Sequence, residues 1–118
     1  MISEPFSVEI EREGEVHAFN VVGELDQATA EALREPLKEA ISAGATAVLV
    51  DLSGCKFIDS TGLSVLVEAH RELRGNSHGG FSVCCPDAQV RRLLEITGLD
   101  ETMRVVESRD EAIARLNV

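Results

Sequence analysis

The chain has 118 residues, of which 44% are hydrophobic and only 3% aromatic, and its formal net charge is −10. This length suits a single domain over residues 1–118 with an aliphatic core. The excess of acidic residues repels nucleic-acid backbones and anionic membrane surfaces, so we expect neither as a direct partner and favour a partner with a basic face.

The N-terminal region has the pattern of a strand pair. Phe6, Val8 and Ile10 alternate with polar residues, which is typical of a strand with one face in water. Glu13-Gly14 suits a turn, and residues 16–22 form a more apolar run. We therefore expect a hairpin at the start of the chain.

A helix is predicted next, because Leu33, Leu37 and Ile41 recur every four residues. Asp26 is a candidate for the residue that caps its start. Pro36 lies inside this pattern and is expected either to kink the helix or to reset its start.

The middle of the chain alternates strand and helix patterns. Residues 47–52 are almost continuously apolar, which indicates a central parallel strand covered on two faces. A helix, a glycine-rich loop at residues 75–80 and a strand at residues 81–85 follow. The apolar stripe of that helix consists of Leu63, Leu66, Val67, His70 and Leu73.

The last third carries clear helix-boundary signals. Asp87 suits the start of one helix, Gly98 suits its left-handed C-terminal cap, and residues 108–111 resemble a capping box before a final helix. Residues 103–106 are expected to form a short strand between these helices. The whole order predicts an α/β fold: a mostly parallel sheet with an antiparallel N-terminal edge strand and about four helices.

The cysteines do not suggest a disulfide framework or a metal site. There are three, Cys55, Cys84 and Cys85, no CxxC motif occurs, and the histidines lie far apart in sequence. No basic-then-apolar leader pattern opens the chain, and its apolar runs are too short to span a bilayer. We expect a cytoplasmic protein with buried, reduced thiols and no cofactor.

The sequence FIDSTGL, at residues 57–63, joins an apolar strand to a helix through Asp59, Ser60, Thr61 and Gly62. One role for these polar residues is helix capping, because acids and hydroxyls accept hydrogen bonds from the first N–H groups of a helix. A second role makes Ser60 a phosphorylation site, since a phosphate is tolerated at a helix N-terminus. Both roles remain open from these residues alone.

A third role makes Ser60 a catalytic nucleophile. That role needs a positioned base and an oxyanion hole. The motif G-x-S-x-G is absent here, and the nearest histidine in the predicted helix, His70, lies more than two turns away. We therefore do not expect an enzyme.

The chain resembles the STAS domain family, and within it the bacterial anti-sigma factor antagonists. The matching segments are GELD at 23–26, DLSGCKFIDSTGL at 51–63, SVCCPDAQVRRLLEITGLD at 82–100 and the closing helix. The resemblance implies that the unmodified protein binds an anti-sigma factor that is also a serine kinase with a histidine-kinase-like ATPase fold. It further implies that phosphorylation of Ser60 ends this binding and that a PP2C-type phosphatase restores it.

The resemblance also implies a partner-binding surface made of Asp26, Asp59, Ser60, Thr61 and Gly62. The two acids are expected to orient the serine hydroxyl or to face the partner's nucleotide site, with helix capping as the alternative. Ser64 stands where many relatives have glycine, and Thr61 and Ser64 are alternative acceptors. A different function within the family is that of a non-catalytic subunit in a lipid-transport or anion-transport system or in a sensory scaffold; the serine at 60 favours the antagonist.

Overall fold

Strands and helices follow one another in an order close to the predicted one. The computed structural model describes residues 5–74 and 80–116. The strands are β1 (Ser7–Glu13), β2 (Val16–Leu25), β3 (Ala47–Ile58), β4 (Gly80–Cys84) and β5 (Val105–Val106). The helices are α1 (Ala30–Ser42), α2 (Ser60–Leu73), α3 (Ala88–Ile96), α4 (Leu99–Thr102) and α5 (Arg109–Ala114).

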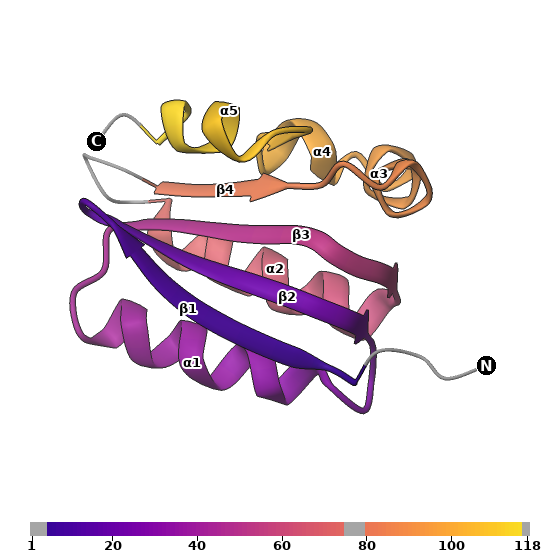
Figure 1. Cartoon of the computed structure of the whole chain (residues 1–118), viewed down its shortest axis with the longest axis horizontal. Coiled ribbons are helices and arrows are strands. Elements are labelled where there is room, and N and C mark those ends of the chain that lie inside the picture. Colours follow the sequence, from indigo (N-terminus) through magenta and orange to yellow (C-terminus); the bar gives the residue numbers. More distant parts are fainter. Residues whose placement is uncertain (1–4, 75–79, 117–118) are drawn as a thin grey trace.

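The strands lie in the sheet in chain order. β1 runs antiparallel to β2, and the other neighbouring pairs are parallel. Because parallel crossovers are right-handed, helices that connect strands added in one direction lie on the same face of the sheet. Accordingly, α1 and α2 lie together on one face and α5 lies on the other, next to β4 (Figure 1). The predicted fold class is confirmed.

Two apolar clusters lie on opposite faces of the sheet. The larger joins β2 and β3 to α1, α2 and α3, and includes Phe19, Leu33, Leu66 and Leu94. The smaller lies under α5 and includes Leu49 and Leu116. Since β3 faces both clusters, residues 47–52 are all buried, as the continuous apolar run predicts.

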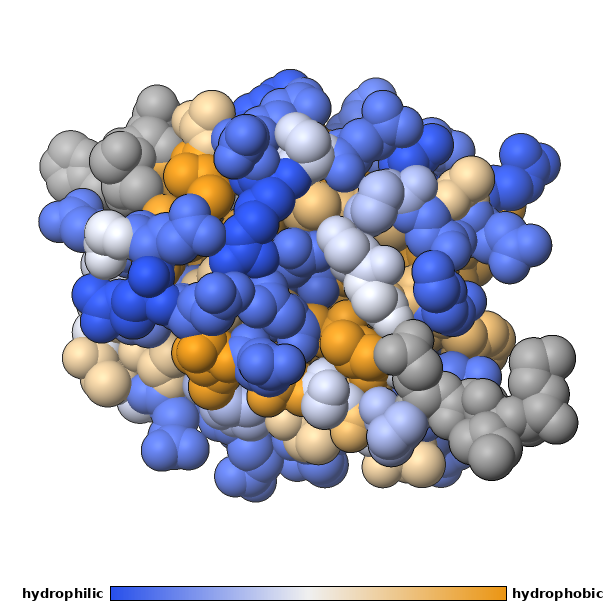
Figure 2. Space-filling model, in the orientation of Figure 1, coloured by the Kyte–Doolittle hydropathy of each residue, from blue (hydrophilic) through white to orange (hydrophobic). Residues whose placement is uncertain are grey.

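The face seen in Figure 2 is mostly polar. Hydrophilic side chains cover most of this face, with apolar atoms showing in places between them. β1 is an edge strand, and three of its exposed residues are Glu9, Glu11 and Glu13. Charged side chains on an edge strand discourage pairing with the edge of another sheet. Of the helices in the described part of the chain, none is long and apolar enough to cross a bilayer.

Local boundary signals were predicted well. Asp87 is the N-cap of α3 and accepts hydrogen bonds from two backbone N–H groups, and Ser108 is the N-cap of α5. Gly98 follows α3 with φ of 75°, the left-handed conformation that glycine favours. Of the predicted loop at residues 75–80, residues 75–79 lie outside the described residues and Gly80 begins β4.

Strand lengths and one helix differ from expectation. β2 continues to Leu25 and β3 continues to Ile58, and their far ends pair with each other, Leu25 beside Ile58. Polar and glycine residues interrupt the apolar pattern after Leu52, so periodicity alone ends β3 too early. The four-residue helix α4 was not predicted at all.

Pro36 lies inside α1, which runs from Ala30 to Ser42. The proline therefore does not reset the start of the helix. Burial of Leu33 and Leu37 against the core holds the helix together on both sides of the proline.

Candidate functional site

Ser60 is the first residue of α2 and is exposed. It follows β3 directly, at the carboxyl end of the strand. Because β2 and β3 are parallel and Leu25 pairs with Ile58, the loop after β2 lies next to the start of α2. The predicted residues Asp26 and Ser60 are thus brought to one edge of the sheet.

Asp59 connects these two segments through both of its carboxylate oxygens. Oδ1 accepts a hydrogen bond from the backbone N–H of Gly62 at 3.0 Å, which caps α2. Oδ2 accepts one from the backbone N–H of Gln27 at 3.1 Å. The backbone N–H of Asp59 also donates to the carbonyl oxygen of Leu25 at 3.2 Å. The capping role predicted for Asp59 is present, and it fixes the helix start that carries Ser60.

Asp26 does not cap α1 as expected. The N-cap of that helix is Thr29, because a turn at residues 27–29 separates Asp26 from the helix. Oδ1 of Asp26 accepts hydrogen bonds from the backbone N–H groups of Ala28 at 3.0 Å and Thr29 at 3.2 Å. Asp26 therefore shapes the loop beside Ser60 rather than the helix that follows it.

Gly62 is buried, and the reason is close backbone packing. A Cβ atom at this position would lie 2.6 Å from the carbonyl oxygen of Leu25 and 2.8 Å from its Cγ. This close approach occurs within the chain, between α2 and β2. Contact of Gly62 with a partner stays a prediction.

The other hydroxyls of the first helical turns differ from that of Ser60 in their surroundings. Thr61 is half-buried, and its carbonyl oxygen accepts a hydrogen bond from the Ser64 hydroxyl at 2.7 Å. Ser64 is exposed, but its hydroxyl is directed back to its own helix. Of the exposed hydroxyl-bearing residues at the start of α2, Ser60 is the nearest to the end of β3.

Phe57 is an exposed apolar residue close to the motif, and it is not among the site residues predicted from the sequence. Its side chain is 48% exposed at the end of β3. It lines two shallow hollows, one shared with Asp26, Gln27, Ala28 and Asp59, and one shared with Lys56, Ile58, Gln89, Val90 and Leu93. Period-2 alternation gives no signal for this exposure, because Cys55 and Ile58 are both buried although they are three residues apart. The pairing of β2 with β3 shifts register here, with Gly23 opposite Cys55 and Glu24 opposite Phe57, so the alternation breaks just before Phe57.

A histidine base for Ser60 is not found in residues 5–74 and 80–116. His17 lies near the start of β2, at the opposite end of the sheet from Ser60. His70 lies ten residues further along α2, or about 15 Å at the rise of an α-helix. The described part also contains no group of three or more His, Cys, Asp or Glu side chains that could hold a metal ion. The site at the start of α2 therefore presents the exposed hydroxyl of Ser60 without a histidine base beside it among the described residues.

Cys55, Cys84 and Cys85 are buried free thiols, as predicted. Burial raises the pKa of all three, and raises that of Cys85 to about 12. Such thiols stay protonated and unreactive at neutral pH.

Comparison with known proteins supports one family. The STAS domain model matches residues 7–112. The anti-sigma-F factor antagonist RsfB of Mycobacterium tuberculosis is 33% identical over 98 residues, which cover 83% of this chain and 79% of RsfB.

Solved structures give the same result. An anti-sigma factor antagonist from Mycobacterium paratuberculosis is similar with a TM-score of 0.88 and 29% identity, over 98% of each chain. The cell fate determinant SpoIIAA of Bacillus, in its phosphorylated form, is similar with a TM-score of 0.71 and 26% identity, over 94% of this chain and all of that one (100%).

Proposed function

The chain belongs to the STAS domain family, and we propose that it is an anti-sigma factor antagonist whose binding is switched off by phosphorylation of Ser60. The observation that carries this proposal is the placement of Ser60. It is exposed at the first position of α2 and directly follows Asp59, which lines one hollow together with Asp26 and the exposed Phe57.

The local structure can accept a phosphate without refolding. The carboxylate of Asp59 already caps α2, so the helix start does not depend on the Ser60 hydroxyl. A phosphate on Ser60 adds a charge of about −1.5 to −2 near the positive end of the helix dipole. Asp26 and Asp59 supply negative charge nearby, so the added charge acts chiefly on a docked partner.

The electrostatic effect is large enough for a switch. A charge near −2 at about 5 Å from a partner carboxylate is repelled by roughly 2 to 6 kcal/mol for effective dielectric constants of about 80 to 20. A hundredfold loss of affinity needs only about 2.7 kcal/mol.

The partner we propose is an anti-sigma factor that is also a serine kinase with a histidine-kinase-like ATPase fold. It contacts Asp26, Phe57, Asp59, Ser60 and Thr61, a set we call the switch surface. A PP2C-type phosphatase removes the phosphate, and the cycle takes place in the cytoplasm. Gly62 is buried and contributes indirectly to this surface, because its lack of a side chain allows α2 to pack closely against Leu25.

The test compares capture by the wild type with capture by Ser60→Asp, Ser60→Ala and Ser64→Ala from lysate of the source organism. Wild type, Ser60→Ala and Ser64→Ala should bind a kinase-like ATPase. Ser60→Asp should bind it at least about tenfold more weakly, because the added carboxylate carries part of the phosphate charge. Affinity is then measured by calorimetry with the purified partner.

The same variants locate the modified residue. With ATP and the captured kinase, mass spectrometry should find phosphate on the wild type and on Ser64→Ala, and none on Ser60→Ala. Undiminished phosphorylation of Ser60→Ala contradicts the proposed site. Equal binding of wild type and Ser60→Asp, for example to transporter subunits, contradicts the proposed switch.

A further inference from the structure

A hollow with a basic lining lies at the end of α2 that is remote from Ser60. Its lining residues include His70, Leu73, Arg74, Phe81, Thr102 and Arg104. They come from the end of α2, the start of β4 and the junction between α4 and β5. The hollow is thus built from three parts of the fold and shares no residue with the switch surface.

The two arginines of this hollow have no carboxylate partner within residues 5–74 and 80–116. Among the described residues, Arg12, Arg71 and Arg92 also have no carboxylate partner, and the arginines that do have one are Arg34, Arg91, Arg109 and Arg115. The side chain of Arg104 donates through Nη1 to the backbone oxygen of Arg115 at 2.8 Å, which uses one of its five N–H donors.

Arg104 occupies a backbone position that normally favours glycine. Its φ is 56°, and it is the sole non-glycine residue with positive φ in the described part of the chain. It comes just after the end of α4, where a left-handed residue closes a helix, as Gly98 does after α3. An arginine is disfavoured there relative to glycine, which points to a role for its side chain.

His70 lines the same hollow as Arg74 and Arg104. Its Nδ1 is buried without a hydrogen-bond partner among the described residues. Burial lowers the pKa of His70, and the positive charges of Arg74 and Arg104 lower it further. The negative end of the α2 dipole favours a cation at the end of this helix, which explains the presence of Arg74 there. It does not explain the presence of Arg104, which comes from a different element.

We propose that this hollow binds a small phosphate-bearing anion, held by the guanidinium groups of Arg74 and Arg104 beside the imidazole of His70. Guanidinium groups match phosphate oxygens in pairs of parallel hydrogen bonds. Three basic groups that converge on one polar hollow fit such an anion better than an apolar ligand. This site is independent of Ser60 and of the proposed antagonist function.

The experiment follows the His70 ring signal by NMR in the full chain, assigned with a His70→Gln variant. Inorganic phosphate is added over the millimolar range, with potassium chloride at matched ionic strength as the baseline. The signal should shift to saturation with phosphate. The apparent pKa of His70 should rise, because a bound anion stabilises the charged imidazole.

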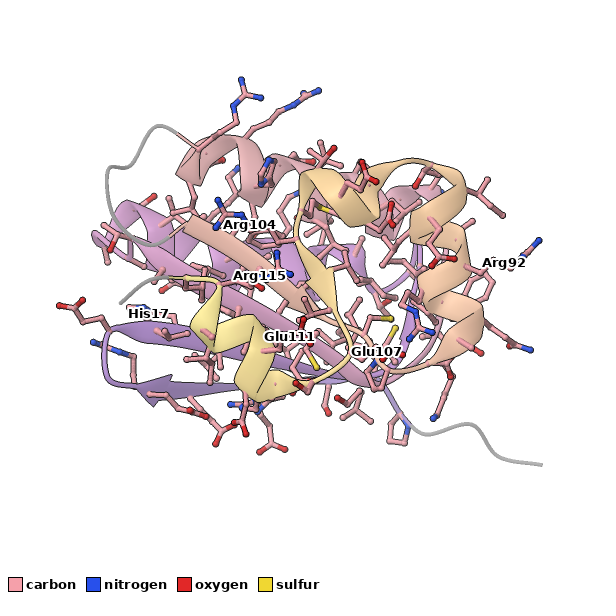
Figure 3. The ribbon with its side chains drawn as sticks, turned by 90° about the horizontal axis from the view of Figure 1, so that it is seen from above. His17, Arg92, Arg104, Glu107, Glu111 and Arg115 are labelled. Carbon is pink, nitrogen blue, oxygen red and sulfur yellow. The ribbon has the colours of Figure 1, made fainter. Side chains whose placement is uncertain are left out.

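Variants test the two arginines separately. Arg74→Ala and Arg104→Ala should each weaken phosphate binding about tenfold or more, since each removes charged hydrogen bonds. Arg92→Ala is the matched control and should bind as the wild type does. Arg92 projects from α3 on the far side of the molecule from Arg104 (Figure 3) and has no carboxylate partner among the described residues either.

Several outcomes would overturn the site. These are a shift that does not saturate, an equal shift with chloride, or an equal loss of binding in Arg92→Ala. If Arg104→Ala fails to fold, as judged by its amide spectrum, Arg74→Ala still decides. Titrations with ATP and with glycerol phosphate then identify the kind of ligand that carries the phosphate. Tighter binding of ATP than of inorganic phosphate supports a polyphosphate ligand. Tighter binding of glycerol phosphate than of inorganic phosphate supports a ligand of the lipid-headgroup type.

Discussion

Gly62 is the single residue on which the placement of Ser60 depends most directly. Its backbone N–H donates to Asp59, and its missing side chain lets α2 approach Leu25. A Cβ at 2.6 Å from a carbonyl oxygen cannot be accommodated without movement of the helix or of β2. The glycine of the motif therefore positions the serine, whatever else it contacts.

Gly62→Ala should lower the free energy of unfolding by about 1 to 3 kcal/mol, which urea denaturation measures. The sign is informative because alanine normally stabilises a helix interior by about 1 kcal/mol over glycine. Ser64→Ala, two residues further along the exposed side of the same helix, is the control and should change stability little. A Gly62→Ala variant as stable as the wild type would show that the contact with Leu25 relaxes freely.

At the scale of elements, α1 keeps its helical form despite Pro36. A proline there lacks the N–H that would bond to the carbonyl of Ala32. Tertiary contacts offset this loss: Leu33 and Leu37 are buried, and Arg34 donates two hydrogen bonds to Glu68 of α2, at 3.2 and 3.1 Å. The helix is held by its neighbours more than by its own propensity.

Pro36→Ala should raise the free energy of unfolding by about 2 to 3 kcal/mol. Alanine is favoured over proline in a helix interior by roughly 3 kcal/mol, while the loss of a rigid proline from the unfolded chain offsets about 0.4 to 1 kcal/mol of this gain. Thermal and urea unfolding measure the change, with Glu35→Ala as a control on the exposed side of α1. A destabilised Pro36→Ala would mean that packing of the proline ring outweighs the helix term.

At the scale of the whole molecule, Arg109 ties α5 to three strands. Its guanidinium donates to Asp51 at 2.9 Å, to Asn20 at 2.7 Å, to Glu11 at 3.1 Å and to Glu13 at 3.0 Å. Asp51 is only 9% exposed, so it depends on these partners. The network joins the antiparallel edge of the sheet to the C-terminal helix.

The pH dependence of stability should report this network. Burial acts to raise the pKa of Asp51, but hydrogen bonds from Ser53 and Arg109 together outweigh it and hold the pKa below its usual value. A carboxyl whose pKa is lowered by folding stabilises the protein above its unfolded pKa of about 3.9 and loses that contribution as the pH falls through the folded pKa. Stability of the wild type should therefore fall more steeply below about pH 5 than that of Asp51→Asn.

Urea unfolding at a series of pH values measures this difference. At neutral pH, Asp51→Asn should be less stable than the wild type by about 1 to 3 kcal/mol, because Arg109 loses its most buried partner. Glu111→Gln, which removes the exposed pair with Arg115, should change stability by less than about 1 kcal/mol. Parallel pH profiles for the wild type and Asp51→Asn would show that Asp51 does not drive the acid sensitivity.

Local signals in the sequence predicted the features that depend on near neighbours. The caps at Asp87 and Ser108 and the left-handed Gly98 were correct, because each depends on hydrogen bonds or backbone angles within a few residues. Asp26 was assigned to the wrong element for a related reason: the turn between it and α1 has no strong periodic pattern. Phe57 was missed because its exposure depends on how far β3 extends.

Three features can be predicted from the sequence alone: the α/β order of elements, the STAS family and the position of Ser60 at the start of a helix. These follow from periodicity, capping and a motif, which are all properties of contiguous residues. The surroundings of that serine, and the residues at the other end of its helix, depend on how the chain folds in three dimensions. Asp59 bonds to Gln27, 32 residues away, and Arg104 approaches His70 from another element. Such contacts arise from strand pairing and helix packing, so no local pattern predicts them.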